Sequence, residues 1–181
     1  GLEQAEVGLA KRLLWRDLQN ITQAAELLFA ACQQQQRVLI VGDYDADGAT
    51  GVALAVSALR AFGLRQVDYL VPDRIRYGYG LSPALAALAL KQRPDVVVTV
   101  DNGISSIAGV AVLREAGVRV VVTDHHLPGD ELPVADAIVN PNQAGDRFAS
   151  KALAGVGVMF YLMLALRQCH HEAGLPTPNM A

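Results

Sequence analysis

Three aspartates stand at alternate positions directly after a short apolar run. Asp43, Asp45 and Asp47 follow residues 37–41, Arg-Val-Leu-Ile-Val, and precede a stretch of small residues that predicts a helix. Ionised carboxylates at this spacing repel one another, and holding several together without a compensating charge is costly. A strand that delivers them to one point therefore predicts bound cations, and metal ions are the most suitable ones.

Two further polar clusters also follow apolar runs. Asp101 comes after residues 95–100, and Asp124, His125 and His126 come after residues 118–123. The strands of an open parallel sheet bring their carboxyl ends to one edge, and ligands bind there at the point where the strand order reverses. We therefore expect the five aspartates and two histidines of the three clusters to converge in one crevice.

The chemistry of this set follows from its donor atoms. Such side chains offer roughly six to eight ligand atoms, enough for two divalent ions a few ångströms apart. A mixture of carboxylate and imidazole favours manganese and leaves magnesium as an alternative. Two bridged ions lower the pKa of a shared water molecule and neutralise phosphate oxygens during an in-line displacement. The pattern therefore predicts hydrolysis of a phosphoester.

Three different kinds of site fit the aspartate run less well. An EF-hand loop needs a glutamate where Leu54 stands, and no strand precedes such a loop. A dinucleotide-binding fingerprint needs glycines where the aspartates stand, and carboxylates would repel a pyrophosphate. A phosphatase of the haloacid-dehalogenase type expects threonine or valine at Ala49 and has no use for paired histidines.

Two glycine-containing segments are candidates for contact with a phosphorylated substrate. Arg74 and Arg76 precede Tyr79 in a loop, where arginine can grip phosphate and tyrosine can stack on a base; an exposed basic loop is the alternative. Gly155 begins the last helix, where backbone amides can face a phosphate or glycine can simply allow close packing. The pair at residues 170–171, His-His, is predicted to be structural or solvated.

The elements that must position these residues alternate along the chain. A helix capped by Asn20 and Gln23 is expected before the first strand. Continuous β-branched runs predict strands that are buried on both faces of a parallel sheet. We expect a doubly wound α/β domain with a mainly parallel five-stranded sheet in the order 2-1-3-4-5 and helices on both faces. Strands are predicted at 37–42, 66–71, 95–100, 118–123 and 136–139, and helices at about 49–62, 82–92, 105–116 and 152–166, with Gly63 and Gly117 closing two of them.

The composition is that of a folded domain. Of 181 residues, 52% are hydrophobic and 18% charged, and the formal charge is −3. The five clustered aspartates account for all of this negative charge, so it does not argue against a polyanionic substrate. Cys32 and Cys169 have no paired spacing, which fits a reducing compartment. No apolar run is long enough to span a membrane, and no export signal opens the chain, so we expect a cytoplasmic protein.

The motifs at residues 43–48, 100–103 and 123–126 together resemble those of the DHH phosphoesterases, a family named after the triplet at 124–126. Segments 73–82, 126–129, 140–142 and 153–157 support the resemblance, which covers residues 37–166 and is strongest to the branch that degrades single-stranded DNA. It implies a nuclease dependent on manganese or magnesium that acts from the 5′ end in recombination and repair. A monomer is expected, with a repair helicase or single-strand-binding protein as a partner by resemblance alone.

The resemblance also implies roles for individual residues. The implied metal ligands are Asp45, Asp47, Asp101 and His125, with Asp43 and Asp124 close by. His126 would be a ligand or contact the phosphate, and it would act with Asp45, Asp47, Asp101 and His125 in catalysis. The candidate substrate-binding residues are Arg74, Arg76, Tyr79, His126 and Gly155.

The resemblance divides the chain into a helical lead-in at 1–36, a catalytic domain at 37–171 and the start of a linker at 172–181. Family members carry a further metal-binding aspartate and an associated domain downstream, so this chain is expected to fold, to bind metal weakly and to hydrolyse DNA poorly or not at all. Two alternatives stay open: a phosphodiesterase of the same superfamily that acts on oligonucleotides, cyclic dinucleotides or pyrophosphate, and a scaffold without enzyme activity.

Overall fold

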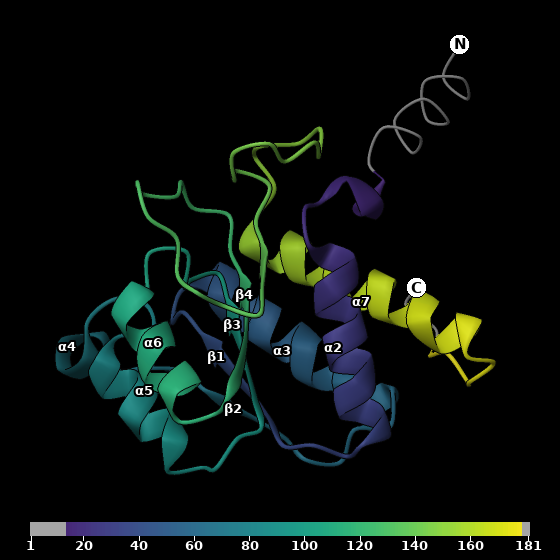
Figure 1. Cartoon of the computed structure of the whole chain (residues 1–181), viewed down its shortest axis with the longest axis horizontal. Helices are drawn as coiled ribbons and strands as arrows, with labels where there is room; N and C mark the ends of the chain where they lie inside the picture. Colours follow the sequence, from purple (N-terminus) through teal and green to yellow (C-terminus); the bar gives the residue numbers. More distant parts are fainter. Residues whose placement is uncertain (1–13, 179–181) are drawn as a thin grey trace.

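Five parallel strands form the centre of the molecule (Figure 1). The structure is a computed structural model that describes residues 14–178. Their order in the sheet is β2-β1-β3-β4-β5, and every pairing is parallel. The predicted sheet and its strand order are therefore confirmed. The strands are β1 (Val38–Gly42), β2 (Val67–Leu70), β3 (Val96–Val100), β4 (Arg119–Thr123) and β5 (Ala137–Val139).

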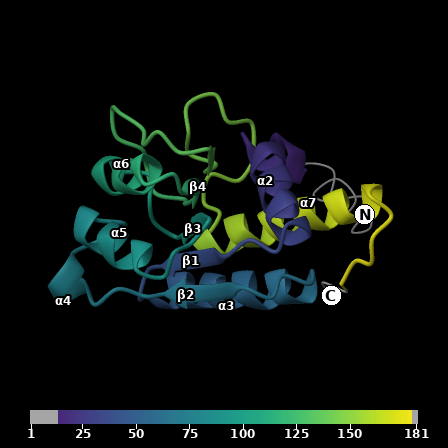
Figure 2. The same ribbon diagram turned by 60° about the horizontal axis from the view of Figure 1, so that its bottom comes forward.

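Helices cover both faces of this sheet, as Figures 1 and 2 show. Strand side chains alternate between two cores because successive residues point to opposite faces. Val38, Ile40 and Val98 lie in the larger core, whereas Leu39 and Val97 lie in the smaller one. The larger core contains α2 (Ile21–Gln33), α3 (Ala46–Ala61) and α7 (Gly155–Glu172), and the smaller contains α5 (Pro83–Leu90) and α6 (Ile107–Glu115).

The register brings four strands to an end at one level. Gly42 is paired with Val100, Val100 with Thr123, and Thr123 with Val139. The next residue of each strand therefore leaves the sheet at the same edge. These four residues are Asp43, Asp101, Asp124 and Asn140.

Three local predictions need correction. The capping box before α2 does not form: Asn20 has φ 61° and makes no side-chain cap, and its Nδ2 instead donates to the carbonyl of Ile138. Helix α3 begins three residues earlier than predicted because the carboxylate of Asp45 caps it, accepting from the N–H of Gly48 at 2.8 Å. The segment at 74–77 is one turn of helix, α4 (Arg74–Tyr77), not a loop.

Other predicted boundaries lie close to those of the structure. Gly63 and Gly117 follow α3 and α6 with φ of 89° and 81°, as expected for left-handed helix ends. Helix α7 begins at residue 155 instead of 152. The short 3-10 helix η1 (Trp15–Asp17) precedes α2.

Part of the predicted domain division falls on residues 1–13 and 179–181, which lie outside the described range. Within it, α2 belongs to the same core as the sheet, so the described part of the predicted lead-in is packed onto the sheet. No helix between residues 14 and 178 combines the length and hydropathy that a membrane crossing requires.

Candidate metal centre

Two groups of side chains at the carboxyl edge of the sheet have the spacing of metal ligands. The first consists of Asp43, Asp45 and Asp101, and the second of Asp101, His125 and His126. Within each group, one potential ligand atom per residue lies within 4.8 Å of the others. Asp101 belongs to both groups, so the arrangement offers two neighbouring cation positions that share one carboxylate.

The Asp101 carboxylate is fully buried and incompletely satisfied. Its Oδ1 lies 3.0 Å from Nε2 of His125, yet within the described chain it accepts no hydrogen bond. Leaving a buried acceptor unsatisfied costs about 1–3 kcal/mol. An oxygen and an imidazole nitrogen that face each other at this distance without a hydrogen bond are arranged as two ligands of a common cation. The donor set therefore fits a metal ion.

Electrostatics at Asp101 point the same way. Burial raises the pKa of its carboxyl from 3.8 to about 7, and the charges of Asp47 and Asp45 contribute further. Among the described side chains, no lysine or arginine forms an ion pair with any of the five clustered aspartates. A divalent cation would supply the missing positive charge and favour the ionised carboxylate.

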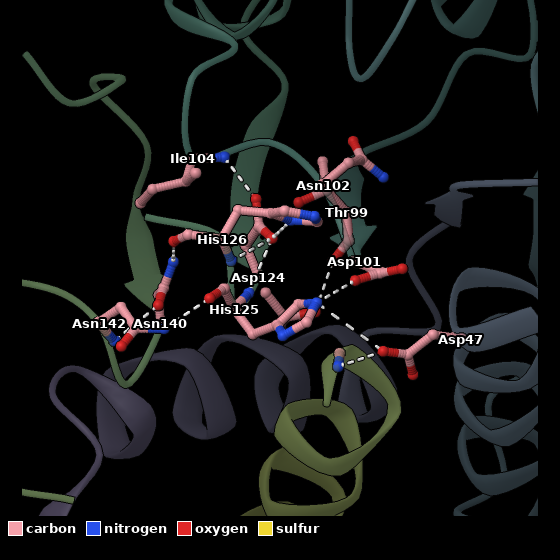
Figure 3. A network of polar contacts seen from close by, with 12 residues as sticks. Asp47, Thr99, Asp101, Asn102, Ile104, Asp124, His125, His126, Asn140 and Asn142 are labelled. Carbon is pink, nitrogen blue, oxygen red and sulfur yellow. Dashed lines mark hydrogen bonds and ion pairs between the residues drawn. The ribbon is translucent and has the colours of Figure 1, made fainter. Parts of the chain in front are cut away.

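Asp47 is held by the beginning of α7 (Figure 3). The N–H of Gly155 donates to its Oδ2 at 2.7 Å, and the N–H of Val156 donates to its Oδ1 at 2.8 Å. The same Oδ2 lies 3.9 Å from Nε2 of His125, so Asp47 borders the second group without completing it. The amide of Gly155, a candidate for contact with a phosphate or for close packing, donates to a carboxylate of the site.

Asp124, a predicted metal ligand, lies outside both groups and holds the histidine loop. Its Oδ2 accepts from the N–H of Ile104 at 2.9 Å. Its Oδ1 accepts from the N–H of His125 at 2.7 Å and of His126 at 3.2 Å, and lies 2.7 Å from Nδ1 of His126. Because this oxygen already accepts from backbone donors, Nδ1 of His126 is the donor in the last contact.

Tyr79, a candidate substrate-binding residue, lies beside the histidines. Its hydroxyl lies 3.3 Å from Nε2 of His126, and the two rings meet edge to face. Burial lowers the pKa of His126, but the hydrogen bond to Asp124 and the charges of Asp124 and Asp101 outweigh it and raise that pKa overall. Burial and the neighbouring carboxylates, Asp124 first, raise the pKa of Tyr79, so its hydroxyl stays protonated.

Of the two predicted arginines, Arg76 is the one whose side chain the structure describes. Arg76 is exposed, and its guanidinium lies 5.4 Å from the ring centre of Tyr77, its own neighbour in α4. The side chain of Arg74 lies outside what the structure describes. His170 is buried between Phe29 and Phe62, far along α7, which agrees with the predicted structural role.

Three asparagines support the site and were not predicted to do so. Nδ2 of Asn140 donates to the carbonyl of His126 at 2.9 Å, and Nδ2 of Asn142 donates to that of His125 at 2.6 Å. Asn102 is buried, and its Nδ2 joins the ends of β1 and β3 through the carbonyls of residues 41 and 100. The one sequence signal for Asn140 and Asn142 was that segment 140–142 supports the family resemblance. The register then places Asn140 level with Asp101 and Asp124.

Comparison with known proteins shows to which family this chain belongs. The model of the DHH family, N-terminal domain, matches residues 37–181. The chain belongs to the DHH family. The resemblance predicted from the motifs is thereby confirmed over the whole region that forms the sheet and the candidate metal centre.

Several known proteins are similar to this chain over most of its length. The single-stranded-DNA-specific exonuclease RecJ of Haemophilus influenzae is 58% identical over 160 residues, which are 88% of this chain and 28% of that protein. RecJ of Dickeya dadantii is 53% identical over 186 residues, 99% of this chain and 32% of that protein.

A solved structure of the same kind shares the fold. The crystal structure of exonuclease RecJ bound to manganese has a TM-score of 0.77 and 40% identity, covering 89% of this chain and 40% of that one. The chain spans about a third of the length of the curated relatives it matches.

Proposed function

We propose that this chain carries the metal-binding part of a nuclease that hydrolyses single-stranded DNA from its 5′ end. The observation that carries the proposal is the buried Asp101 carboxylate, which is shared by two ligand groups and has an unsatisfied oxygen facing His125. Relatives named as single-stranded-DNA-specific exonucleases, at up to 58% identity, support the substrate.

We further propose Mn²⁺, or Mg²⁺, as the cofactor. Asp43, Asp45 and Asp101 would hold one ion, and Asp101, His125 and His126 the other. Bound ions of this kind supply Lewis acidity, a more acidic water molecule and neutralisation of phosphate charge. The manganese in the solved structure of a similar RecJ supports this choice.

The chain's own residues then have distinct tasks in the proposed reaction. Asp124 accepts a hydrogen bond from Nδ1–H of His126 and so fixes the imidazole ring. Nε2 of His126 is then left to face the substrate or to bind a metal ion. Tyr79, half exposed beside His126, offers a hydroxyl donor and a ring face to the incoming strand. Asp47 accepts hydrogen bonds from the first amides of α7, at the positive end of the helix dipole, and borders the His125 position.

The remaining parts of the proposal rest on the family resemblance. They are a catalytic domain at 37–171 with its linker beginning at 172, a monomeric state, location in the cytoplasm, and cooperation with a repair helicase or single-strand-binding protein.

A substrate comparison tests the proposal. The full-length protein that contains this chain is incubated with Mn²⁺ and a 5′-phosphorylated single strand, the matching duplex, a dinucleotide or pyrophosphate. We expect the single strand to be degraded fastest, and Asp45→Ala to abolish this. Asp68, on β2, is also an exposed aspartate. Asp68→Ala is therefore the matched control and should retain activity.

Equal cleavage of the duplex, or unchanged activity of Asp45→Ala, would contradict the proposal. Faster hydrolysis of the dinucleotide or pyrophosphate would favour the other phosphodiesterases of the superfamily. Absence of hydrolysis by a protein that binds Mn²⁺ would favour a scaffold.

A further inference from the structure

Helix α7 begins in direct contact with two carboxylates of the candidate metal centre. Its first two amides, those of Gly155 and Val156, each donate to one oxygen of Asp47. Amides at a helix N-terminus have no partner within the helix, and the helix dipole favours a negative charge beside them. The carboxylate of Asp47 is therefore fixed in orientation by the start of an 18-residue helix.

The same glycine also lies against Asp101. A Cβ atom added at residue 155 would stand 2.5 Å from Oδ1 and 2.7 Å from Cβ of Asp101, closer than non-bonded atoms approach. The oxygen in question is the buried, unsatisfied one that faces His125. No side chain fits at residue 155 unless α7 or Asp101 moves.

The surroundings of Gly157, two residues further along α7, are different. A Cβ there would meet Cδ1 of Leu153 at 2.6 Å, which is the end of a flexible side chain and not part of the site. Both positions lie in the first turn of α7, so the same substitution, glycine to alanine, can be made at each. The two glycines therefore form a matched pair that differs in contact with the carboxylates.

We propose that Gly155 is a positioning residue of the metal centre. Its amide, with that of Val156, orients Asp47, and its lack of a side chain sets how closely α7 approaches Asp101. Asp47 comes from α3 and Asp101 from the end of β3, so this one contact fixes the relative placement of two carboxylates that are far apart in the sequence. Buried residues of α7, among them Val158 and Met159, anchor the helix in the larger core and make this placement rigid. The inference rests on the proposed metal centre.

Metal titration of the matched pair tests the inference. The dissociation constant of Mn²⁺ is measured by calorimetry for the 181-residue chain, Gly155→Ala and Gly157→Ala, with circular dichroism to follow folding. Loss of a partner that orients metal ligands typically weakens metal binding about 10–100-fold. We expect a loss in this range for Gly155→Ala, and less than about threefold for Gly157→Ala, both variants remaining folded.

Equal affinity of Gly155→Ala and the unchanged chain would overturn the positioning role while leaving the metal centre intact. An unchanged chain that does not bind Mn²⁺ would overturn the metal centre as well. The two failures are therefore distinguishable.

Amide hydrogen exchange provides a test that does not depend on the folding of Gly155→Ala. In Asp47→Asn, the side chain no longer offers two acceptor oxygens, so the amides of Gly155 and Val156 should exchange faster. The amide of Ala173, which donates to the carbonyl of Cys169 at the other end of the helix, is the internal control and should not change. Unchanged exchange at Gly155 and Val156 would overturn the inference.

Discussion

Aspartates flank the sheet at both of its ends, but their surroundings differ. At the amino end, Asp95 precedes β3 and accepts the N–H of Arg37 at 2.7 Å. Asp136 precedes β5, forms an ion pair with Arg114 and accepts the N–H of Val120 at 2.7 Å. At the carboxyl end, Asp43 and Asp101 have no lysine or arginine partner among the described side chains. Within the same part of the chain, Oδ1 of Asp101 also has no hydrogen-bond donor.

The two ends of the sheet use one residue type in two ways. Both aspartates at the amino end complete the hydrogen bonding of the sheet by accepting backbone N–H groups, and the charge of Asp136 is also balanced by Arg114. The cluster at the carboxyl end concentrates negative charge and leaves it unbalanced. Buried charges without partners are retained where a ligand supplies the balance. The carboxyl end is therefore the part of the sheet arranged for function, and the amino end the part arranged for stability.

The largest effect is expected from Asp101→Asn. Both ligand groups contain this residue, so the substitution should weaken Mn²⁺ binding by at least about 100-fold and abolish nuclease activity. Calorimetric titration of this chain with Mn²⁺ measures the first effect, and release of nucleotides from a single strand by the full-length protein measures the second. Retention of wild-type affinity would place the metal centre elsewhere.

A pH effect on stability should come from the same carboxyl group. The pKa of Asp101 is about 7 in the folded chain, against an ordinary 3.8. At pH values between these two, the carboxyl group is therefore protonated to a greater extent in the folded state than in the unfolded state. Without metal, this contribution to stability is complete below the ordinary pKa of 3.8 and is lost as the pH rises through about 7.

Chemical denaturation in the presence of a chelator, at about pH 5 and about pH 8, measures this contribution. The chain should lose more stability than Asp101→Asn between these two pH values, by a few kcal/mol. Mn²⁺ should remove the loss, because it binds the ionised carboxylate. If the free energy of unfolding of the chain and of Asp101→Asn changed in parallel with pH, the unbalanced charge at the carboxyl end of the sheet would be contradicted.

A smaller effect of another kind is expected at the amino end. Asp136→Asn removes the charge that pairs with Arg114 and weakens an acceptor of the sheet, which should lower the free energy of unfolding by about 1–2 kcal/mol. Mn²⁺ affinity should stay within about twofold of the unchanged chain, since the residue lies at the opposite edge. Urea denaturation and metal titration give the two numbers. A large loss of Mn²⁺ affinity would break the distinction between the two ends.

The fold could be predicted well because its signals are local and strong. Continuous runs such as Val96 to Val100 predict strands that are buried on both faces, and the sheet confirms them. The three polar clusters were placed correctly at one edge because parallel strands share their carboxyl ends. The helix at Asn20 was predicted with the wrong cap, since the sequence does not reveal that β5 would take up its side chain.

Within the site, tertiary contacts decided what the motifs could not. Asp47 and Asp124 are equal to Asp101 as candidate ligands in the sequence, yet backbone amides engage the first two and leave the third unsatisfied. Which carboxylate meets an amide depends on how α7 and the loop at 102–104 return to the sheet, and no short pattern encodes that return. The supporting roles of Asn140 and Asn142 depend on the same long-range arrangement.

Stoichiometry and coupling of bound Mn²⁺ test the central claim most directly. If Asp101 is shared between two cation positions, calorimetry should give two Mn²⁺ ions per chain, and electron paramagnetic resonance should show that they are magnetically coupled. Asp101→Asn should lose the coupled pair, whereas Asp136→Asn should keep it. A single uncoupled ion in the unchanged chain, or a coupled pair that survives Asp101→Asn, would contradict a metal centre built around this carboxylate.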